Sequence, residues 1–175
     1  MSCPKPPGPA KLIIGLFLKD QNLFDPLYQE FRNAFGPIEI MSHWFPFDFT
    51  SYYEKEMGRP LFRRMIAFNQ LIDQIQLPDI KLKTNEIEAS FMRDKHRQVN
   101  IDPGFVVAER FVLATGKNFS HRIYLNHGIY ADLTLIYQKG KFQTLPWTYP
   151  DYQSNAMIQF LNRVRNNFLF RQQHP

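Results

Sequence analysis

The stretch Lys11-Leu-Ile-Ile-Gly-Leu-Phe-Leu18 is apolar at nearly every position. A strand with one face in water alternates apolar and polar residues, whereas a strand that is covered on both faces is apolar throughout. The stretch therefore predicts a strand at the centre of a sheet with both faces covered. It is also far too short to cross a bilayer, and the leading residues lack the basic start and cleavage site of a signal peptide. We expect no membrane association.

Patterns beyond this strand predict the element order βαββαβ. Asp25-Pro26 is a typical helix start, Gly36-Pro37 is a typical stop, and Pro78-Asp79 opens a second helix. Two further stretches alternate in polarity, as strands do, and a fourth expected strand ends at Pro103-Gly104. The strands expected from these patterns are residues 11–18, 38–45, 61–68 and 97–102.

This order is typical of a ferredoxin-like core, so the expected fold class is α+β with a mainly antiparallel sheet. We expect the first and third strands to lie parallel at the centre, with the other two antiparallel beside them. A β-hairpin, a short strand near residues 141–144 and a helix over about 151–170 would extend this core. The expected organisation is a disordered proline-rich tail over residues 1–10 and a single domain over residues 11–175.

The charge balance favours an anionic partner. The formal net charge is +5 and the pI is about 9.3, and clustered Lys and Arg side chains attract phosphate groups. The single cysteine, Cys3, lies in the expected tail. Such cysteine usage fits a reduced, cytoplasmic setting.

The segment after residue 114 predicts a β-hairpin with one polar side. With Asn126-His127-Gly128 as its loop, Tyr124 faces Tyr130 and Arg122 faces Asp132. The period of two places the apolar side chains together on the other side, where we expect them in the core. These residues are Ile123, Leu125, Ile129, Ala131, Leu133 and Leu135.

The polar side of this hairpin has two interpretations. It is either a solvated face, on which an Arg-Asp pair contributes well under about 1 kcal/mol, or the floor of a binding site. In the second interpretation Lys117, His121 and Arg122, here called the basic group, hold a phosphate or carboxylate. We expect His121 to point toward the apolar side, where a half-buried structural histidine is common.

A second set of polar residues comes from the loop between the second and third strands and from the fourth strand. If strands two and four both run against strand one, this loop meets the exit of strand four. We call Tyr53, Glu54, Glu56, Asn100 and Asp102 the acidic group. Glu54, Glu56 and Asp102 would bind Mg²⁺ through oxygen ligands, or they are solvated loop and turn residues. On the second helix, Asn85 and Glu88 form a third polar pair, which is otherwise an ordinary helix surface or a cap near Thr84.

Familiar nucleotide and hydrolase motifs are absent from the sequence. No glycine begins a Gly-x4-Gly-Lys-Ser/Thr loop, and Gly-x-Gly-x-x-Gly, Gly-x-Ser-x-Gly and His-Glu-x-x-His are missing as well. The sequence therefore does not specify a reaction.

Several motifs resemble those of a prokaryotic family known as domain of unknown function 4416. They are Phe45-Pro-Phe47, Tyr52-Tyr-Glu-Lys-Glu-Met-Gly58, Ile80-Lys-Leu-Lys-Thr-Asn85, Val99-Asn-Ile-Asp-Pro-Gly104, His121-Arg-Ile-Tyr-Leu125 and Trp147-Thr-Tyr-Pro-Asp-Tyr152. Members are sometimes labelled GTP-binding, so the resemblance implies a nucleotide ligand. It also places family motifs at both the acidic and the basic group.

Three hypotheses for the function follow. The first is an enzyme or binding protein for a small phosphate-bearing ligand, such as a nucleotide with Mg²⁺. Its catalytic residues would be Glu54, Glu56, Asp102 and His121, its ligand-binding residues Tyr53, Asn100, Lys117 and Arg122, and its metal ligands Glu54, Glu56 and Asp102. The alternatives are a noncatalytic interaction domain with an exposed apolar patch and an RNA-binding module with bases stacked on exposed aromatic rings.

Overall fold

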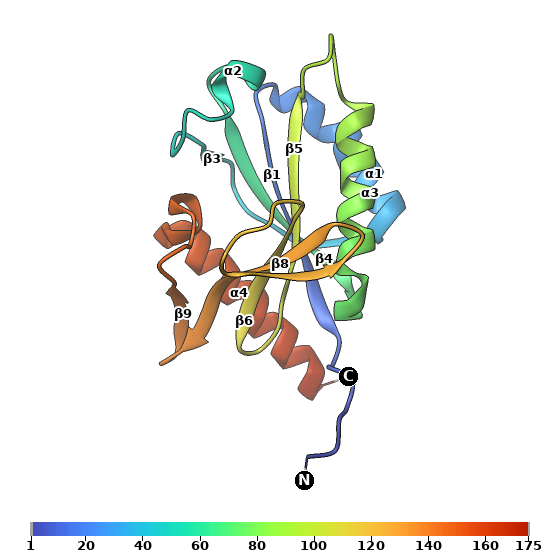
Figure 1. Cartoon of the computed structure of the whole chain (residues 1–175), viewed down its shortest axis with the longest axis vertical. Coiled ribbons are helices and arrows are strands. Elements are labelled where there is room, and N and C mark those ends of the chain that lie inside the picture. Colours follow the sequence, from blue (N-terminus) through green and yellow to red (C-terminus); the bar gives the residue numbers. More distant parts are fainter. Residues whose placement is uncertain (1, 175) are drawn as a thin grey trace.

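The computed structural model describes residues 2–174, so Met1, in the expected tail, and Pro175, in the expected domain, lie outside the described residues. The described chain is a mixed α/β structure with a large open antiparallel sheet and four α-helices (Figure 1). The strands are β1 (Ala10–Leu18), β2 (Ile38–Met41), β3 (Phe45–Pro46), β4 (Phe62–Ile72), β5 (Val99–Val106), β6 (Arg110–Thr115), β7 (Arg122–Asn126), β8 (Ile129–Gln138) and β9 (Lys141–Thr144). The helices are α1 (Phe24–Phe35), α2 (Glu54–Met57), α3 (Leu77–Ser90) and α4 (Asn155–Gln173), with short 3-10 turns before α1, α3 and α4.

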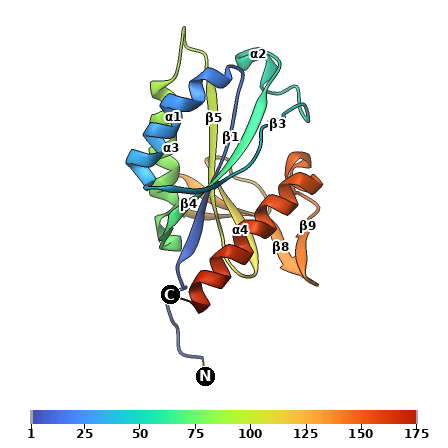
Figure 2. The ribbon, with the colours of Figure 1, turned by 180° about the vertical axis from the view of Figure 1, so that it is seen from behind.

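The strand β1 lies inside the sheet, as its sequence predicts. The sheet order is β2-β4-β1-β5-β6-β8-β7, and β3 also pairs with β4 and β9 with β8. Every residue of β1 is buried. Leu12, Ile14, Leu16 and Leu18 pack against α1 and α3, whereas Ile13 packs on the opposite face against α4. Figures 1 and 2 show α1 and α3 on one side of the sheet and α4 on the other.

The expected parallel pairing at the centre is wrong. The first strand, β1, pairs antiparallel with the third, β4, and also antiparallel with the fourth, β5. A helical crossover returns the chain in its starting direction. The strand β2 therefore points in the same direction as β1, and β5 points in the same direction as β4. The connection from β2 to β4 reverses the chain between the two crossovers. Residue patterns predict which face a side chain occupies but not the direction of its neighbouring strand.

Several strand boundaries also differ from the prediction, since β4 continues to Ile72 and β5 begins only at Val99. The strand expected over 38–45 is interrupted, with β2 ending at Met41 and β3 resuming at Phe45. The strand β5 continues through Pro103 and Gly104 to Val106. The N–H and the C=O of Ile101 both form hydrogen bonds with α3 side chains, so they point away from β1. The backbone of Pro103, two residues further along the strand, lies on the same edge of β5. β6 pairs with β5 only from Gly104 onward, so Pro103 needs no N–H in the ladder.

The hairpin after residue 114 has the predicted register but not all of the predicted burial. Arg122 pairs with Asp132 and Tyr124 with Tyr130. The loop is His127-Gly128, both at positive φ, and a register shift at Leu125 restores the expected pairing. Ile129 is buried as expected, whereas Ile123 and Leu125 are exposed. This correction follows from the sheet order, because β7 is an edge strand with no helix over it. Leu135 is buried on the opposite face, against α4, because a register shift in the pairing of β8 with β6 reverses the side to which it points.

The C-terminal strand and the buried face of the C-terminal helix agree with the sequence patterns, although this helix begins at Asn155 instead of near residue 151 and continues to Gln173. β9 covers residues 141–144, and α4 buries Met157, Leu161, Val164 and Phe168. The strand β6 was not predicted. In the expected tail, residues 2–9 are exposed and form no helix or strand, but Ala10 is buried in β1. Within residues 2–174, none of the helices has the length and apolar character needed to cross a membrane.

Candidate functional site

One half of the α4-side face of the sheet is polar. The helix α4 packs beside Ile13, while Gly15 and Phe17 lie farther along β1 on the same face. Because directly paired residues share a face, Gly15 lies beside Asp102 and Phe17 lies beside Asn100. The segment from residue 47 to residue 61, here called the α2 loop, closes this half of the face through Phe47, Met57 and Leu61, which pack on Phe17.

The α2 loop meets the beginning of β5, not its exit. The expected meeting point is wrong because β2 points in the same direction as β1. The loop therefore lies at the Leu18 end of β1, and β5 starts beside that end, where Leu18 pairs with Val99. Arg97, just before β5, donates to both carboxylate oxygens of Glu56, over 2.8 and 2.6 Å. These hydrogen bonds hold the pKa of Glu56 below its usual value.

A hydrogen-bonded chain then continues along β5. Arg97 Nη1 donates to Asn100 Oδ1 over 3.0 Å, and Asn100 Nδ2 donates to Asp102 Oδ2 over 2.9 Å. Asn100 and Asp102 therefore share a side, as predicted. Asn100 is buried, whereas the carboxylate side chain of Asp102 is about one third exposed. Glu56 and Asp102 are thus both partly exposed, but Glu56 is held by Arg97, whereas Asp102 accepts only from Asn100 among the described residues and lies 3.9 Å from Arg63.

Tyr53 lies over this part of the sheet. Its ring contacts Phe17 edge-on with centroids 4.6 Å apart, and the Arg97 guanidinium lies 5.7 Å from its centroid. Burial, together with the negative charge of Asp102, raises the pKa of Tyr53 to about 12. Tyr53 is therefore a neutral hydrogen-bonding group at physiological pH.

A buried arginine lies beneath Asp102. Arg63 on β4 forms an ion pair with Asp151 and donates to the hydroxyl of Tyr152, and its Nη2 lies 3.9 Å from Asp102 Oδ2. Gly15 makes room for this arrangement, because a Cβ there would lie 3.0 Å from both Arg63 Nη2 and Tyr152 Oη. Burial raises the pKa of Tyr152, so this hydroxyl also stays protonated.

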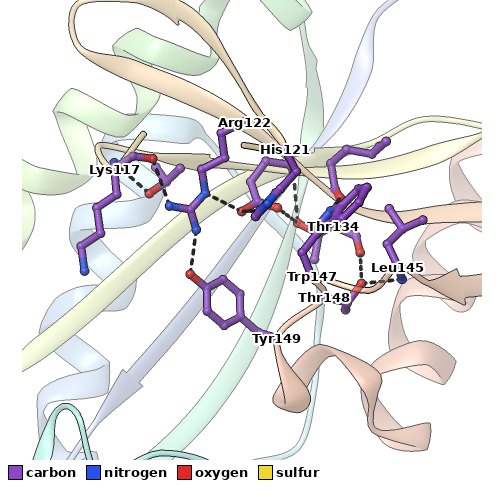
Figure 3. Close-up of polar contacts among 11 residues, drawn as sticks. Lys117, His121, Arg122, Thr134, Leu145, Trp147, Thr148 and Tyr149 are labelled. Atoms are coloured by element: carbon purple, nitrogen blue, oxygen red, sulfur yellow. Dashed lines mark hydrogen bonds and ion pairs between the residues drawn. The ribbon is translucent and has the colours of Figure 1, made fainter. Parts of the chain in front are cut away.

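The basic group is organised around Arg122 (Figure 3). Arg122 Nε donates to Asp132 Oδ2 over 2.9 Å, Nη1 to the carbonyl of Lys117 over 3.0 Å, and Nη2 to the hydroxyl of Tyr149 over 2.7 Å. The side chains of Arg122 and Asp132 are 7% and 4% exposed. The interpretation of this side as a solvated face is therefore wrong at this pair, and Arg122 mainly fixes its neighbours.

His121 turns to the polar side of the hairpin, contrary to the prediction. Its Nε2 lies 3.3 Å from Asp132 Oδ2, and its ring stacks on Trp147 with centroids 4.9 Å apart. The alternation of a strand does not apply to His121, because β7 begins only at Arg122. Trp147 is held in turn by a hydrogen bond from its Nε1 to the carbonyl of Leu133.

Lys117 links the two groups. It is exposed, its Nζ lies 3.4 Å from the hydroxyl of Tyr52 and 4.8 Å from the centre of that ring. Tyr52 in turn contacts Tyr53 edge-on at 4.9 Å. Within the described residues Lys117 forms no ion pair. It is therefore the member of the basic group whose charge is available to a ligand.

The three expected metal ligands are not arranged together. Glu54 pairs with Arg59, Glu56 binds Arg97, and Asp102 accepts from Asn100. Over residues 2–174, no group of three or more His, Cys, Asp or Glu side chains has an arrangement suited to a metal ion. The structure thus gives the expected Mg²⁺ site no support. Glu54 and Glu56 are engaged in ion pairs with arginines.

The sequence interpretation missed several residues of this site. The residues not selected as site candidates are Arg63, Arg97, Tyr149, Asp151 and Tyr152. Arg63 was the detectable case, because a charged residue within an otherwise alternating buried strand needs a partner. The other contacts join segments far apart in the sequence, such as Arg97 with Glu56, 41 residues apart, and Arg122 with Tyr149, 27 residues apart.

A separate hollow lies on the opposite side of the sheet. It measures about 430 Å³ and is bounded by the start of α3 and the tip of the β7–β8 hairpin. The exposed side chains of Ile75 and Leu125 line it together with Asp79 and His127. No member of the acidic or the basic group lines this hollow.

The fold and the site define a mixed α/β protein with a polar, partly buried network on one half of a sheet face. The chain belongs to the family described as Domain of unknown function (DUF4416), whose model matches residues 8–168. The comparisons with curated proteins and with solved structures found no match.

Proposed function

We propose that the protein binds a small phosphate-bearing ligand between the acidic and the basic group. The observation that carries this proposal is the contact of Lys117 with Tyr52, which joins two segments 65 residues apart in the sequence. A phosphate on Lys117 would form a charge-assisted hydrogen bond without competition from a neighbouring carboxylate. Asp102 would accept hydrogen bonds from hydroxyl or amino groups of the same ligand.

The neighbouring residues would prepare this surface. Arg122 fixes the carbonyl of Lys117 and the hydroxyl of Tyr149, so it orders both sides of the proposed phosphate position. The hydrogen-bonded chain from Glu56 through Arg97 and Asn100 to Asp102 fixes the side chains of the acidic group. A site held by such contacts loses little side-chain entropy on binding. A nucleotide would satisfy this chemistry through its phosphates and its sugar hydroxyls.

Substitution of Lys117 tests the proposal. A thermal-shift screen would use inorganic phosphate, pyrophosphate, sugar phosphates and nucleoside phosphates, because a ligand of the folded state raises Tm by mass action. We expect at least one compound to raise Tm in the wild type. Lys117→Ala should weaken its binding by roughly tenfold or more, since a hydrogen bond to a charged group contributes about 1.5–3 kcal/mol.

Lys141→Ala is the matched control, because Lys141 is also exposed but lies on β9 at another part of the sheet. It should bind as the wild type does. Equal affinities for the wild type and Lys117→Ala would contradict the assignment of the phosphate to Lys117. A screen without any Tm rise would contradict the proposed function itself.

A noncatalytic interaction domain is the second candidate. Ile75 is 85% exposed and lies with Leu125 at the hollow on the other side of the sheet. Exposed apolar residues of this kind are common at sites of protein contact. The two candidates use opposite faces, so mapping the residues that respond to a ligand separates them.

We also infer that the first half of the chain is a ferredoxin-like core. The units β1-α1-β2 and β4-α3-β5 each contain one helical crossover, and their strands lie in the order β2-β4-β1-β5 with antiparallel neighbours. This arrangement supports the inference. The strands from β6 onward extend the sheet beyond β5.

A further inference from the structure

Exposed aromatic side chains lie on several segments connected to Lys117. Tyr52 and Phe119 are each 64% exposed, Tyr124 is 57% exposed and Tyr149 is 48% exposed. They come from the α2 loop, the β6–β7 connection, β7 and the segment before α4. Large rings left in water at several neighbouring positions suggest a surface that is covered by a ligand with flat faces.

A series of contacts connects these rings into one surface. Tyr124 contacts Tyr130 with centroids 5.4 Å apart, and Tyr130 pairs with Thr115 on β6. Thr115 Oγ1 accepts from the backbone N–H of Lys117 over 3.2 Å, and the Lys117 amine reaches Tyr52. The surface therefore runs from the β7–β8 hairpin across Lys117 to the α2 loop.

Arg122 connects the remaining rings to the same surface. It lies two residues before Tyr124 on the same side of β7, and it donates to the hydroxyl of Tyr149. Phe119 contacts the ring of His121 edge-on at 5.5 Å. The aromatic residues thus extend on both sides of the phosphate position assigned to Lys117, farther than a small ligand needs.

We propose that this surface binds single-stranded nucleic acid, with bases stacked on exposed rings such as Tyr52 and Tyr124 and a backbone phosphate on Lys117. The inference rests on the proposed function, because it uses the same phosphate position. Every base has an aromatic face, and single strands leave these faces free, whereas a duplex hides them in its stack. The formal net charge of +5 attracts a polyanion to the protein.

The sheet does not use its central strands for this contact. β1 is buried along its whole length, and the exposed rings lie on the β7–β8 hairpin and its neighbours. RNA-recognition domains with this element order stack bases on exposed rings of the middle strands, and the buried β1 offers no such rings. The structure assigns a different platform, at the edge of the sheet.

Fluorescence anisotropy with labelled oligonucleotides tests the inference. The probes are an oligouridine RNA, an oligothymidine DNA of the same length, and a duplex of matched length, all at low salt because phosphate contacts weaken with salt. We expect either or both single strands to bind more tightly than the duplex. The two single-stranded probes show whether the 2′-hydroxyl contributes.

Tyr124→Ala is the decisive variant, because Tyr124 lies beyond the proposed small-ligand position. It should weaken oligonucleotide binding by about fivefold or more, as expected for the loss of one stacked base. The same variant should keep the Tm shift caused by a small phosphate compound. Tyr124→Phe should bind oligonucleotides normally, and so should Phe170→Ala, which removes an equally exposed ring on α4.

Three results would overturn the inference. They are a lack of single-strand binding at low salt, equal binding of the duplex, and unchanged binding by Tyr124→Ala. A dimer that dissociates in Tyr124→Ala, measured by light scattering, would assign the edge strand to a second copy of the chain instead.

If a small phosphate compound binds and oligonucleotides do not, the inference fails while the proposed function stands. If no small phosphate compound binds, the proposed function fails whatever the oligonucleotides do.

Discussion

Arg122 and Lys117 carry the same charge but have different surroundings. Each of the three kinds of nitrogen on Arg122 has a partner, and its charge is balanced by Asp132. Lys117 has a tyrosine hydroxyl beside it and no carboxylate among the described residues. Removing one member of a buried charge pair leaves the other uncompensated. Arg122 is therefore a poor choice for a functional test, whereas Lys117 is a good one.

Tyr53 gives a prediction at the scale of a single residue. Its pKa is raised from 10.0 to about 12, so the unfolded chain releases this proton at lower pH than the folded chain does. Its contribution to stability is complete below pH 10 and is lost as the pH rises toward 12. The free energy of unfolding, measured by urea titration at a series of pH values, should fall less steeply across this range in Tyr53→Phe.

The buried Tyr152 also has a raised pKa, so some loss of stability with rising pH should remain in Tyr53→Phe. Identical pH slopes for the variant and the wild type would contradict the environment described for Tyr53. Absorbance titration of the tyrosinate would locate the ionisation directly.

At the scale of elements, α3 replaces a missing neighbour of β5. Lys81 donates to the carbonyl of Ile101, and Glu88 accepts from its N–H. These contacts satisfy backbone groups on the part of β5 that β6 does not reach. Glu88 therefore faces inward, and burial raises its pKa, while Asn85 is exposed. The polar pair expected on the helix surface is divided between two environments.

Gly104 gives a prediction for the packing of β5 against β6. A Cβ at this position would lie 2.3 Å from the backbone carbonyl oxygen of Val112, a distance that requires the strands to shift. Gly104→Ala should lower the free energy of unfolding by about 1–3 kcal/mol, as overpacking does in other cores. Urea unfolding monitored by circular dichroism would measure the change.

Gly116→Ala is the matched control, because a Cβ at Gly116 would have no atom within 4 Å and the residue has no positive φ. It should change stability by less than about 0.5 kcal/mol. Equal effects at the two glycines would show that the close approach of β5 and β6 does not determine the requirement for glycine.

The sequence predicted elements with a strong local pattern and missed relations between strands. β1, β9 and the buried positions of α4 were predicted correctly because burial on a fixed face leaves a periodic pattern. The antiparallel pairing of β1 with β4 left no such pattern. For the same reason the approach of Glu56 to the beginning of β5 was not foreseen. The strand β6 had an apolar run, Phe111 to Ala114, that local analysis could have identified.

The candidate site was predicted in part for the same physical reason. The contact of Arg122 with Asp132 follows from the hairpin register, and that of Asn100 with Asp102 follows from the alternation of side chains along one strand. The contacts of Lys117 with Tyr52 and of Arg63 with Tyr152 require segments that the chain brings together only in three dimensions. Sequence patterns therefore identified members of both groups but not the residues that connect them.

At the scale of the whole molecule, buried charges hold α4 against the sheet. Lys11 on β1 pairs with Glu39 on β2 over 2.9 Å, and Glu39 also binds Asn167 and Arg171 of α4. The Lys11 and Glu39 side chains are largely buried, so this network fixes how far α4 extends over its face. The face beyond α4 carries the polar network, and there Lys117 contacts Tyr52, which lies next to Tyr53.

The central claim is that one ligand contacts both groups at once. At 20.8 kDa, the protein is suitable for mapping backbone amide signals by NMR during titration with the phosphate compound that raises Tm most. The account predicts that signals of residues 52–56, 100–102 and 117–122 shift together, with the same saturation. Shifts in only one of these groups, or shifts confined to residues 74–79 and 125–127 around the opposite hollow, would contradict it.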